Sequence, residues 1–102
     1  MATAYSHEAF AGQLNTKFWL AAAGEPLALE LIEVSPLRRN APYESYSLEL
    51  RGPSGRYIPQ ASYRMDHAAL GQLEIFIVPV RQDRQGLYYE ASFNCLSAEA
   101  AP

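Results

Sequence analysis

Hydrophobic residues dominate residues 73–80, LEIFIVPV, and alternate in the way that is typical of a β-strand. Successive side chains of an extended backbone point to opposite sides, so every second residue from Leu73 shares one apolar face. The other face begins with Glu74 but is apolar from Phe76 onward, whereas a strand with one solvated face would remain polar there. The pattern therefore predicts a strand buried on both faces, with Pro79 marking its end or an edge position.

Five further stretches alternate apolar and polar residues with the same period and are predicted to be strands. They lie at residues 16–22, 27–35, 43–51, 60–66 and 87–95. The apolar phase slips by one residue near Leu31, which predicts a β-bulge in the second of these strands. Pro36 and Pro42 disfavour regular structure between the second and third strands, so we expect a mobile loop over residues 35–42.

Two glycines are placed to close turns between the predicted strands. Asp66 is predicted to cap a single helical turn at residues 67–70, which Gly71 would close in a left-handed conformation. Gly86 precedes the last predicted strand, where a tight turn favours a residue that tolerates a positive φ.

A short helix is predicted near the amino terminus, directly after Ser6. The Ser6 side chain can accept a hydrogen bond from an amide of the first helical turn. Phe10 and Leu14 are four residues apart and would share one face of this helix. We interpret that face as a lid over a sheet face or a barrel mouth, with Trp19 and Phe76 as the side chains that it covers.

The predicted elements define a mainly β fold with an antiparallel sheet, because the short connections leave no room for β-α-β crossovers. We expect a small antiparallel six-stranded barrel with one short N-terminal helix. A sandwich is the alternative, but a closed barrel leaves no exposed strand edges. The 102 residues are expected to form a single domain. Within it, residues 1–15 form the N-terminal helical segment, residues 16–95 the β core and residues 96–102 a tail.

Composition and charge exclude several classes of function. The formal net charge is −3 and the basic residues are scattered, so no basic stripe predicts a nucleic-acid partner. No apolar run approaches the ~18 residues of a membrane span. The single cysteine, Cys95, excludes an internal disulfide and is expected to be buried. Without a recognisable signal peptide we expect a protein that is cytoplasmic as synthesised, with export by a route without a cleavable signal left open.

Four blocks of the sequence resemble a family of small uncharacterised bacterial β-rich domains. In order along the chain they are Tyr46–Pro53, Pro59–Gly71, Phe76–Val80 and Tyr89–Asn94. The family pattern reads F-S-L-x-F-x-G-P, P-Q-G-x-Y-x-x-x-H-x-x-L-G, F-x-V-P-V and Y-x-A-x-F-N. Tyr46 and Leu50 stand at usual Phe positions, and Ala61 stands where Gly is usual. The resemblance implies a β-rich domain without an assigned activity that is associated with a phage-tail-like or fibre assembly.

The candidate catalytic chemistry is sparse, and no cofactor or metal site is predicted. Glu49, Glu74 and Glu90 could form a carboxylate pair of the glycosidase kind, but all three share the outward phase of their strands. We interpret them as solvated charges with cross-strand partners. Asp66 and His67 lack a nucleophile, so we interpret His67 as a hydrogen bonder that anchors a loop. An enzyme would require at least two of five side chains to meet in one cleft: Glu49, Glu74, Glu90, Arg64 and His67.

Aromatic and arginine side chains on the outward phase or in loops are the remaining candidates for a binding site. They are Trp19, Arg38, Arg39, Arg56, Tyr57 and Tyr88. Trp, Tyr and Arg are the residue types enriched at protein interfaces. The sequence therefore favours a non-catalytic protein-binding or accessory module. The alternatives are a small-ligand carrier with a pocket inside the barrel and an enzyme with a carboxylate, Arg and His site.

Overall fold

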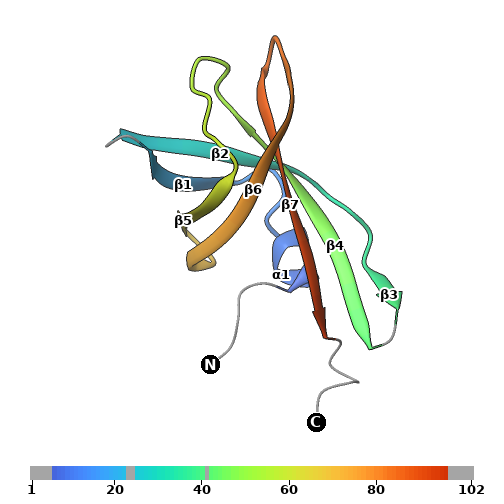
Figure 1. Ribbon diagram of the computed structural model, residues 1–102. Coiled ribbons are helices and arrows are strands. Elements are labelled where there is room, and N and C mark those ends of the chain that lie inside the picture. Colours follow the sequence, from blue (N-terminus) through green and yellow to red (C-terminus); the bar gives the residue numbers. More distant parts are fainter. Residues whose placement is uncertain (1–5, 23–24, 41, 97–102) are drawn as a thin grey trace.

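The computed structural model describes residues 6–22, 25–40 and 42–96, which form one helix and seven strands (Figure 1). In chain order these elements are α1 (His7–Ala11), β1 (Lys17–Ala22), β2 (Glu25–Val34), β3 (Arg38–Asn40), β4 (Tyr43–Gly52), β5 (Ala61–His67), β6 (Gly71–Asp83) and β7 (Gly86–Leu96). The last strand includes Leu96, one residue more than the predicted core. All pairings between these strands are antiparallel.

Six of the strands close a barrel. Their order is β2-β1-β5-β6-β7-β4, and β2 pairs back onto β4 to complete the ring. The prediction of a mainly β, six-stranded antiparallel barrel with one short helix is confirmed. β3 lies outside the ring and pairs with the first residues of β4. The predicted loop over residues 35–42 therefore contains a short strand, because Pro36 and Pro42 flank Arg38–Asn40 without interrupting it.

Two bulges bend the strands of the ring. The register of β2 against β4 shifts between Leu31 and Glu33, as the sequence predicts. A second shift occurs in β6 between Pro79 and Arg81. Pro79 does not end its strand, because a bulge accommodates a residue without an amide hydrogen and β6 continues to Asp83. It does occupy the predicted edge position, since β6 pairs with β5 only as far as Ile77.

The two turn glycines adopt the positive φ angles that the sequence predicts. Gly71 has φ 79° at the start of β6, and Gly86 has φ 153° at the start of β7. At Gly86 an added Cβ would lie 2.1 Å from the backbone oxygen of Gly52. No side chain fits there, so the close approach of the two strands requires glycine.

The barrel opens at one end because β6 and β7 diverge. β7 pairs with β6 from Gly86 to Glu90, but with β4 along its length to Leu96. The first half of β6, from Gly71 to Ile77, pairs with β5 instead. Figure 1 shows the lower parts of β4 and β7 swinging away from β5 and β6. This divergence leaves an opening between two groups of strands.

Helix α1 fills the opening with one aromatic side chain. Ser6 Oγ accepts a hydrogen bond from the Ala9 amide at 3.1 Å, which confirms the predicted N-cap. Phe10 is fully buried, and its ring stacks on that of Phe93 with 5.5 Å between centroids. Leu14, by contrast, is 42% exposed, because the helix ends before it and the two side chains do not share a face.

The inner faces of the strands fill the barrel with apolar side chains, including those of Leu73, Ile75 and Ile77 from β6. The outer face of β6 is open to solvent, and Phe76 is 49% exposed. The prediction of a strand covered on both faces is therefore wrong. The outside of a barrel meets water unless another element covers it, and α1 packs into the opening rather than over Phe76 or Trp19.

Candidate functional site

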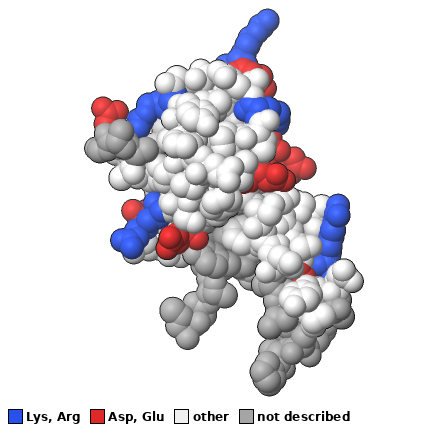
Figure 2. All heavy atoms as spheres, in the orientation of Figure 1, with Lys and Arg blue, Asp and Glu red and all other residues white. Residues whose placement is uncertain are grey.

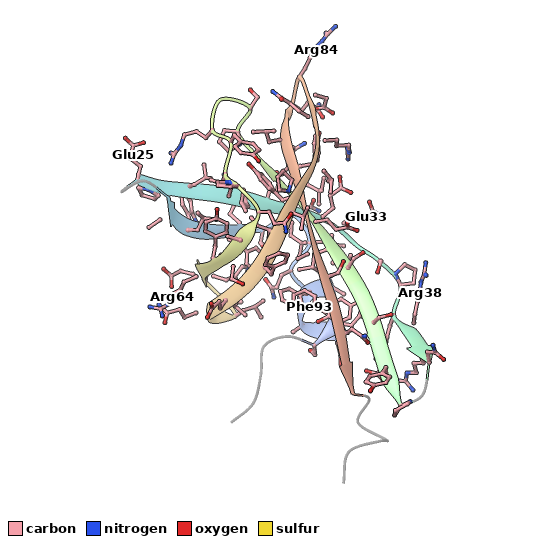
Figure 3. The ribbon with its side chains drawn as sticks, in the orientation of Figure 1. Glu25, Glu33, Arg38, Arg64, Arg84 and Phe93 are labelled. Carbon is pink, nitrogen blue, oxygen red and sulfur yellow. The ribbon has the colours of Figure 1, made fainter. Side chains whose placement is uncertain are left out.

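Four of the predicted interface residues lie at two opposite ends of the barrel. Arg38 and Arg39 belong to β3, beside the first residues of β4. Arg56 and Tyr57 lie in the connection that follows β4, where Arg56 Nη1 is 3.3 Å from Glu25 Oε1. Because β4 has 10 residues, its ends are about 30 Å apart. Figure 3 accordingly shows Arg38 and Glu25 on opposite sides of the molecule. The structure does not bring these four side chains into one site.

The other two predicted interface residues, Trp19 and Tyr88, differ in exposure. Trp19 is 47% exposed on the outer face of β1. Tyr88 is 4% exposed, so the prediction that it is available at the surface is wrong. Its ring points outward, but the Arg81 guanidinium covers it at 3.8 Å, and its hydroxyl donates to Asp83 Oδ2 at 3.0 Å. Tyr88 therefore stabilises the β6–β7 hairpin.

The structure brings together two of the five candidate catalytic residues. Glu49 and Glu90 lie directly opposite each other across β4 and β7, and Glu33 lies opposite Glu49 across β2 and β4. These three carboxylates form an acidic row on the outside of the barrel, beside a shallow hollow of about 200 Å³. Like charges in such a row repel, and the ion pair between Glu49 and Arg81 offsets part of this repulsion.

The remaining candidate catalytic residues lie elsewhere. Arg64 and Glu74 face each other across β5 and β6, and Glu74 lies four residues from Val78, the β6 residue opposite Glu90. His67 is 6% exposed at the end of β5. Glu49 and Glu90 line their hollow together with Ser35 and Ser47, and no histidine is among the described residues that line it. In the part of the chain that the structure describes, no group of three or more potential ligand side chains is placed to hold a metal ion.

His67 anchors two loops through both ring nitrogens. Nδ1 accepts hydrogen bonds from the amides of Ala69 at 2.9 Å and Leu70 at 3.1 Å. Nε2 lies 2.8 Å from Thr16 Oγ1, so it carries the ring hydrogen and donates it to the hydroxyl. Burial lowers the pKa of His67. The predicted anchoring role is confirmed, but the cap of the turn is His67 itself, because the Asp66 side chain points outward.

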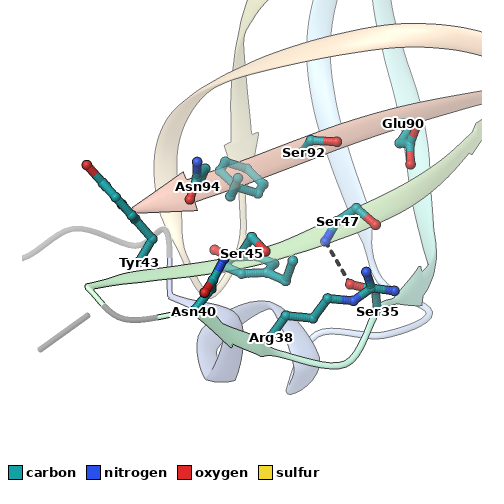
Figure 4. A pocket seen from close by; sticks show the side chains of 11 residues that line it. Ser35, Arg38, Asn40, Tyr43, Ser45, Ser47, Glu90, Ser92 and Asn94 are labelled. Carbon is teal, nitrogen blue, oxygen red and sulfur yellow. Dashed lines mark hydrogen bonds between the residues drawn. The ribbon is translucent and has the colours of Figure 1, made fainter. Parts of the chain in front are cut away.

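A recess with a polar lining lies on the outer face of β4 and β7. We call it the polar hollow; its volume is about 500 Å³. Ser45 and Ser47 of β4 lie opposite Asn94 and Ser92 of β7 and form its floor. Figure 4 shows these four short side chains on two adjacent strands. Its rim carries larger groups, namely Arg38, Asn40, Tyr43 and Glu90.

Hydrogen bonds to the connection between β2 and β3 shape one side of the polar hollow. The Ser47 amide donates to Ser35 Oγ at 2.8 Å, and the Ser35 amide donates to the Ser47 carbonyl at 2.9 Å. Figure 4 shows Arg38 extending from β3 toward Ser35 along this side. Tyr43 closes the far end and is 49% exposed. The hollow thus combines a fixed polar floor with an exposed arginine and tyrosine on its rim.

Sequence patterns identified Arg38 but missed the rest of this constellation. Ser45, Ser47, Ser92 and Asn94 all fall on the outward phase of predicted strands, which is a usable signal. What turns them into one surface is the pairing of β4 with β7, and these strands are far apart in the sequence. Figure 2 shows acidic and basic side chains scattered over the visible face of the molecule.

A third hollow, of about 550 Å³, lies beside Trp19 and Lys17 at the ends of β1 and β5. It is also on the outside of the barrel. The interior is filled by packed side chains, whereas a carrier would need an enclosed internal pocket. The polar hollow and the Trp19 hollow are therefore surfaces on which a partner can rest.

Fold and surface together define a small antiparallel six-stranded barrel whose open end is filled by a short N-terminal helix. Residues 5–93 match the model of a family described as Domain of unknown function (DUF6916), and the chain belongs to this family. The resemblance to a family of small uncharacterised domains is thereby confirmed. No curated protein and no solved structure matches the chain. In the described residues, no helix has the length and apolar character needed to cross a membrane.

Proposed function

We propose that this domain is a non-catalytic protein-binding module and that the polar hollow is its contact surface. The observation that carries the proposal is the combination of an exposed arginine and an exposed tyrosine, Arg38 and Tyr43, around a floor of short polar side chains. Tyr and Arg supply most of the binding energy at protein interfaces, while Ser and Asn supply adaptable hydrogen bonds. The class of partner is the one that the resemblance implies, a phage-tail-like or fibre assembly, to which the domain is an accessory.

Within this surface Arg38 is a better anchor than Arg39. Arg39 Nε lies 3.2 Å from Glu44 Oε2, so its charge is already engaged within the chain. Arg38 borders the polar hollow and extends along it (Figure 4). Removing Arg38 should therefore weaken partner binding more than removing Arg39.

The openness of the polar hollow favours a protein partner over a small ligand. A small-molecule site buries most of its ligand in a concave, mostly apolar pocket. The polar hollow instead has Ser and Asn side chains as its floor and an open rim. A macromolecular surface with hydrogen-bonding groups suits such a recess, because protein interfaces are polar and hydrated at their margins.

Site-specific photo-crosslinking tests this proposal. A photoreactive phenylalanine analogue is placed at Tyr43 in the full chain, and matched control variants carry it at Tyr57 or Trp19, which are 64% and 47% exposed. In cells that express the protein naturally, we expect one defined product at Tyr43 that is lost when Arg38→Glu is added. Equal products at all three positions, or a Tyr43 product that Arg38→Glu leaves unchanged, would contradict the proposal.

A further inference from the structure

One half of β7 pairs with another described strand on one side only. β7 pairs with β6 as far as Glu90, and beyond that residue the strands of the described chain cover it on the β4 side alone. We call the segment Ala91–Leu96 the free edge. It borders the polar hollow, whose floor includes Ser92 and Asn94.

The directions of the backbone groups along the free edge follow from Ser47. Both its amide and its carbonyl are bonded to Ser35, so both point away from β7. In an antiparallel ladder the two residues of such a non-hydrogen-bonded pair direct their groups away from each other. Ser92 is the partner of Ser47, so its amide and carbonyl point to the uncovered side. By alternation the same holds for Asn94, whereas Ala91 and Phe93 bond to β4.

The composition of the free edge lacks the usual protection against strand pairing. Natural sheets guard an edge with charged residues, prolines or bulges. The sequence ASFNCL at residues 91–96 contains no charge, proline or glycine, and its register against β4 is continuous. We propose that an extended segment of a partner protein adds to β7 here as a further strand. This inference rests on the proposed protein-binding function and specifies how binding occurs.

The charges at the start of the free edge select the partner segment. Glu90 is exposed and stands at the end of the acidic row, in which Glu49 is paired with Arg81. A lysine or arginine of the added strand beside Glu90 would gain an opposite-charge cross-strand contact. A second copy of this chain that paired through its own Ala91–Leu96 segment would offer no such cation, because that segment is uncharged. The occupant is therefore a basic segment of another protein.

The inner side of the added strand has different requirements. Side chains alternate along a strand, and those of Ala91 and Phe93 point inward, where the Phe93 ring meets that of Phe10. A strand added beside them places every second side chain at the apolar opening of the barrel. The partner segment should thus alternate apolar and polar residues, with its cation on the polar side.

Amide hydrogen exchange read by NMR on the full chain tests the inference. The probe is an eight-residue peptide that alternates valine and threonine and contains one lysine; a matched peptide has glutamate in place of the lysine. In the free protein the amides of Ser92 and Asn94 should exchange rapidly, and those of Ala91 and Phe93 slowly. The lysine peptide should slow exchange at Ser92 and Asn94 at least about tenfold. It should bind about three- to tenfold more tightly than the glutamate peptide, as a reversed cross-strand charge implies.

Two variants locate the interaction on the free edge. Ser92→Pro removes one of the two amides that point outward without removing a bond to β4, so it should abolish peptide binding. Ser92→Thr keeps the amide and the hydroxyl and should bind as the wild type does. Unchanged slow exchange at Ala91 and Phe93 in both variants shows that the ladder with β4 has survived.

Three results would overturn the inference. Slow exchange at Ser92 and Asn94 in the dilute free protein would mean that the chain itself covers the edge. Protection that rises with protein concentration alone would assign the edge to a second copy. Equal affinity for both peptides would show that Glu90 does not select a basic segment. Each of these results leaves the crosslinking experiment at Tyr43 unaffected, so failure of the strand-addition mode is distinguishable from failure of the proposed function.

Discussion

In the described residues, one free strand edge lies on each side of the first half of β4, and the two edges are built in opposite ways. The β3 edge is three residues long, carries Arg38 and Arg39, and lies between Pro36 and Pro42. The β7 edge is longer and contains neither charge nor proline. Charges and prolines prevent further pairing, so β3 ends the sheet. The contrast indicates that the β7 edge, unlike the β3 edge, lacks the features that prevent another strand from pairing with it.

The opening of the barrel explains why the β7 edge exists at all. Complete closure would pair β7 with β6 along its whole length and leave no edge. β6 pairs with β7 from Val78 onward but with β5 up to Ile77, and Phe10 packs against Phe93 where these strands diverge. The helix thus supports the free half of β7 from the inside while leaving its edge uncovered.

The largest expected effect comes from removing that support. Phe10→Ala deletes a fully buried aromatic ring that contacts Phe93, and it should lower the free energy of unfolding by about 3–5 kcal/mol. Leu14→Ala, at an exposed position four residues on, is the matched control and should change stability by less than about 0.5 kcal/mol. Urea denaturation followed by circular dichroism measures both. A small effect of Phe10→Ala would show that the open end is stable without its aromatic filling.

The paired half of β7 should be most sensitive at Gly86. An added Cβ would lie 2.1 Å from the Gly52 oxygen, so Gly86→Ala must displace backbone and should destabilise the protein by about 1–3 kcal/mol. Gly55→Ala adds the same atom where no other atom lies within 4 Å and should be close to neutral. Thermal unfolding of the two variants checks this. Equal melting temperatures would mean that the hairpin relaxes without loss.

Acid should lower the stability of the protein through His67, which lies on the side of the opening opposite β7. Burial lowers the pKa of His67 below its ordinary value of 6.5, so the unfolded chain takes up this proton before the folded protein does. The stability linked to His67 is complete above pH 6.5 and is lost as the pH falls from there toward the folded-state pKa. The loss is also expected on geometric grounds, because a protonated Nδ1 cannot accept from Ala69 and Leu70.

Urea unfolding between pH 7.5 and pH 5 measures this dependence. His67→Gln should remove the slope in that interval, whereas the matched control His7→Gln should retain it. The titration of Asp83 lies below this pH interval, because the Gln85 amide and, to a lesser extent, the Tyr88 hydroxyl lower the pKa of Asp83 from 3.8. Its contribution is lost below that pH. An unchanged slope in His67→Gln would assign the acid sensitivity to another group.

The strands and the bulge at Leu31 could be predicted from the sequence because side-chain alternation is a local property of the chain. Burial on the outer face could not. The sequence around Phe76 is as apolar as that of a strand buried on both faces. The exposure of Phe76 depends instead on where the helix packs. Tyr88 is the opposite case, because it was predicted to be exposed and is buried. Its ring is covered by Arg81, which a bulge brings into place.

The candidate site was predictable only in part. Arg38 was identified from its residue type and its loop-like surroundings, but its partners in the polar hollow depend on long-range pairing. Ser45 and Asn94 are opposite each other because β4 pairs with β7, and no local pattern encodes the pairing of two strands so far apart in the sequence. Aromatic and arginine residues spread along the sequence thus indicate a binding function in general. Which residues form the binding surface depends on the register between strands that are far apart in the sequence.

The smallest expected effect concerns the guarded edge. Replacing both Arg38 and Arg39 by threonine removes the charges from β3 while keeping a residue type that favours strands. Stability should change by less than about 1 kcal/mol, because exposed ion pairs such as that of Arg39 with Glu44 contribute little. The unguarded edge should, however, pair between molecules, which analytical ultracentrifugation detects as a concentration-dependent rise in sedimentation coefficient.

Arg84→Thr is the control for this variant, because Arg84 lies at the tip of the β6–β7 hairpin, away from both edges (Figure 3). It also changes net charge but should leave the protein monomeric at the same concentrations. If the double variant sediments as Arg84→Thr does, the arginines are not what guards β3. The flanking prolines would then be the barrier, and the contrast between the two edges would rest on backbone geometry rather than on charge.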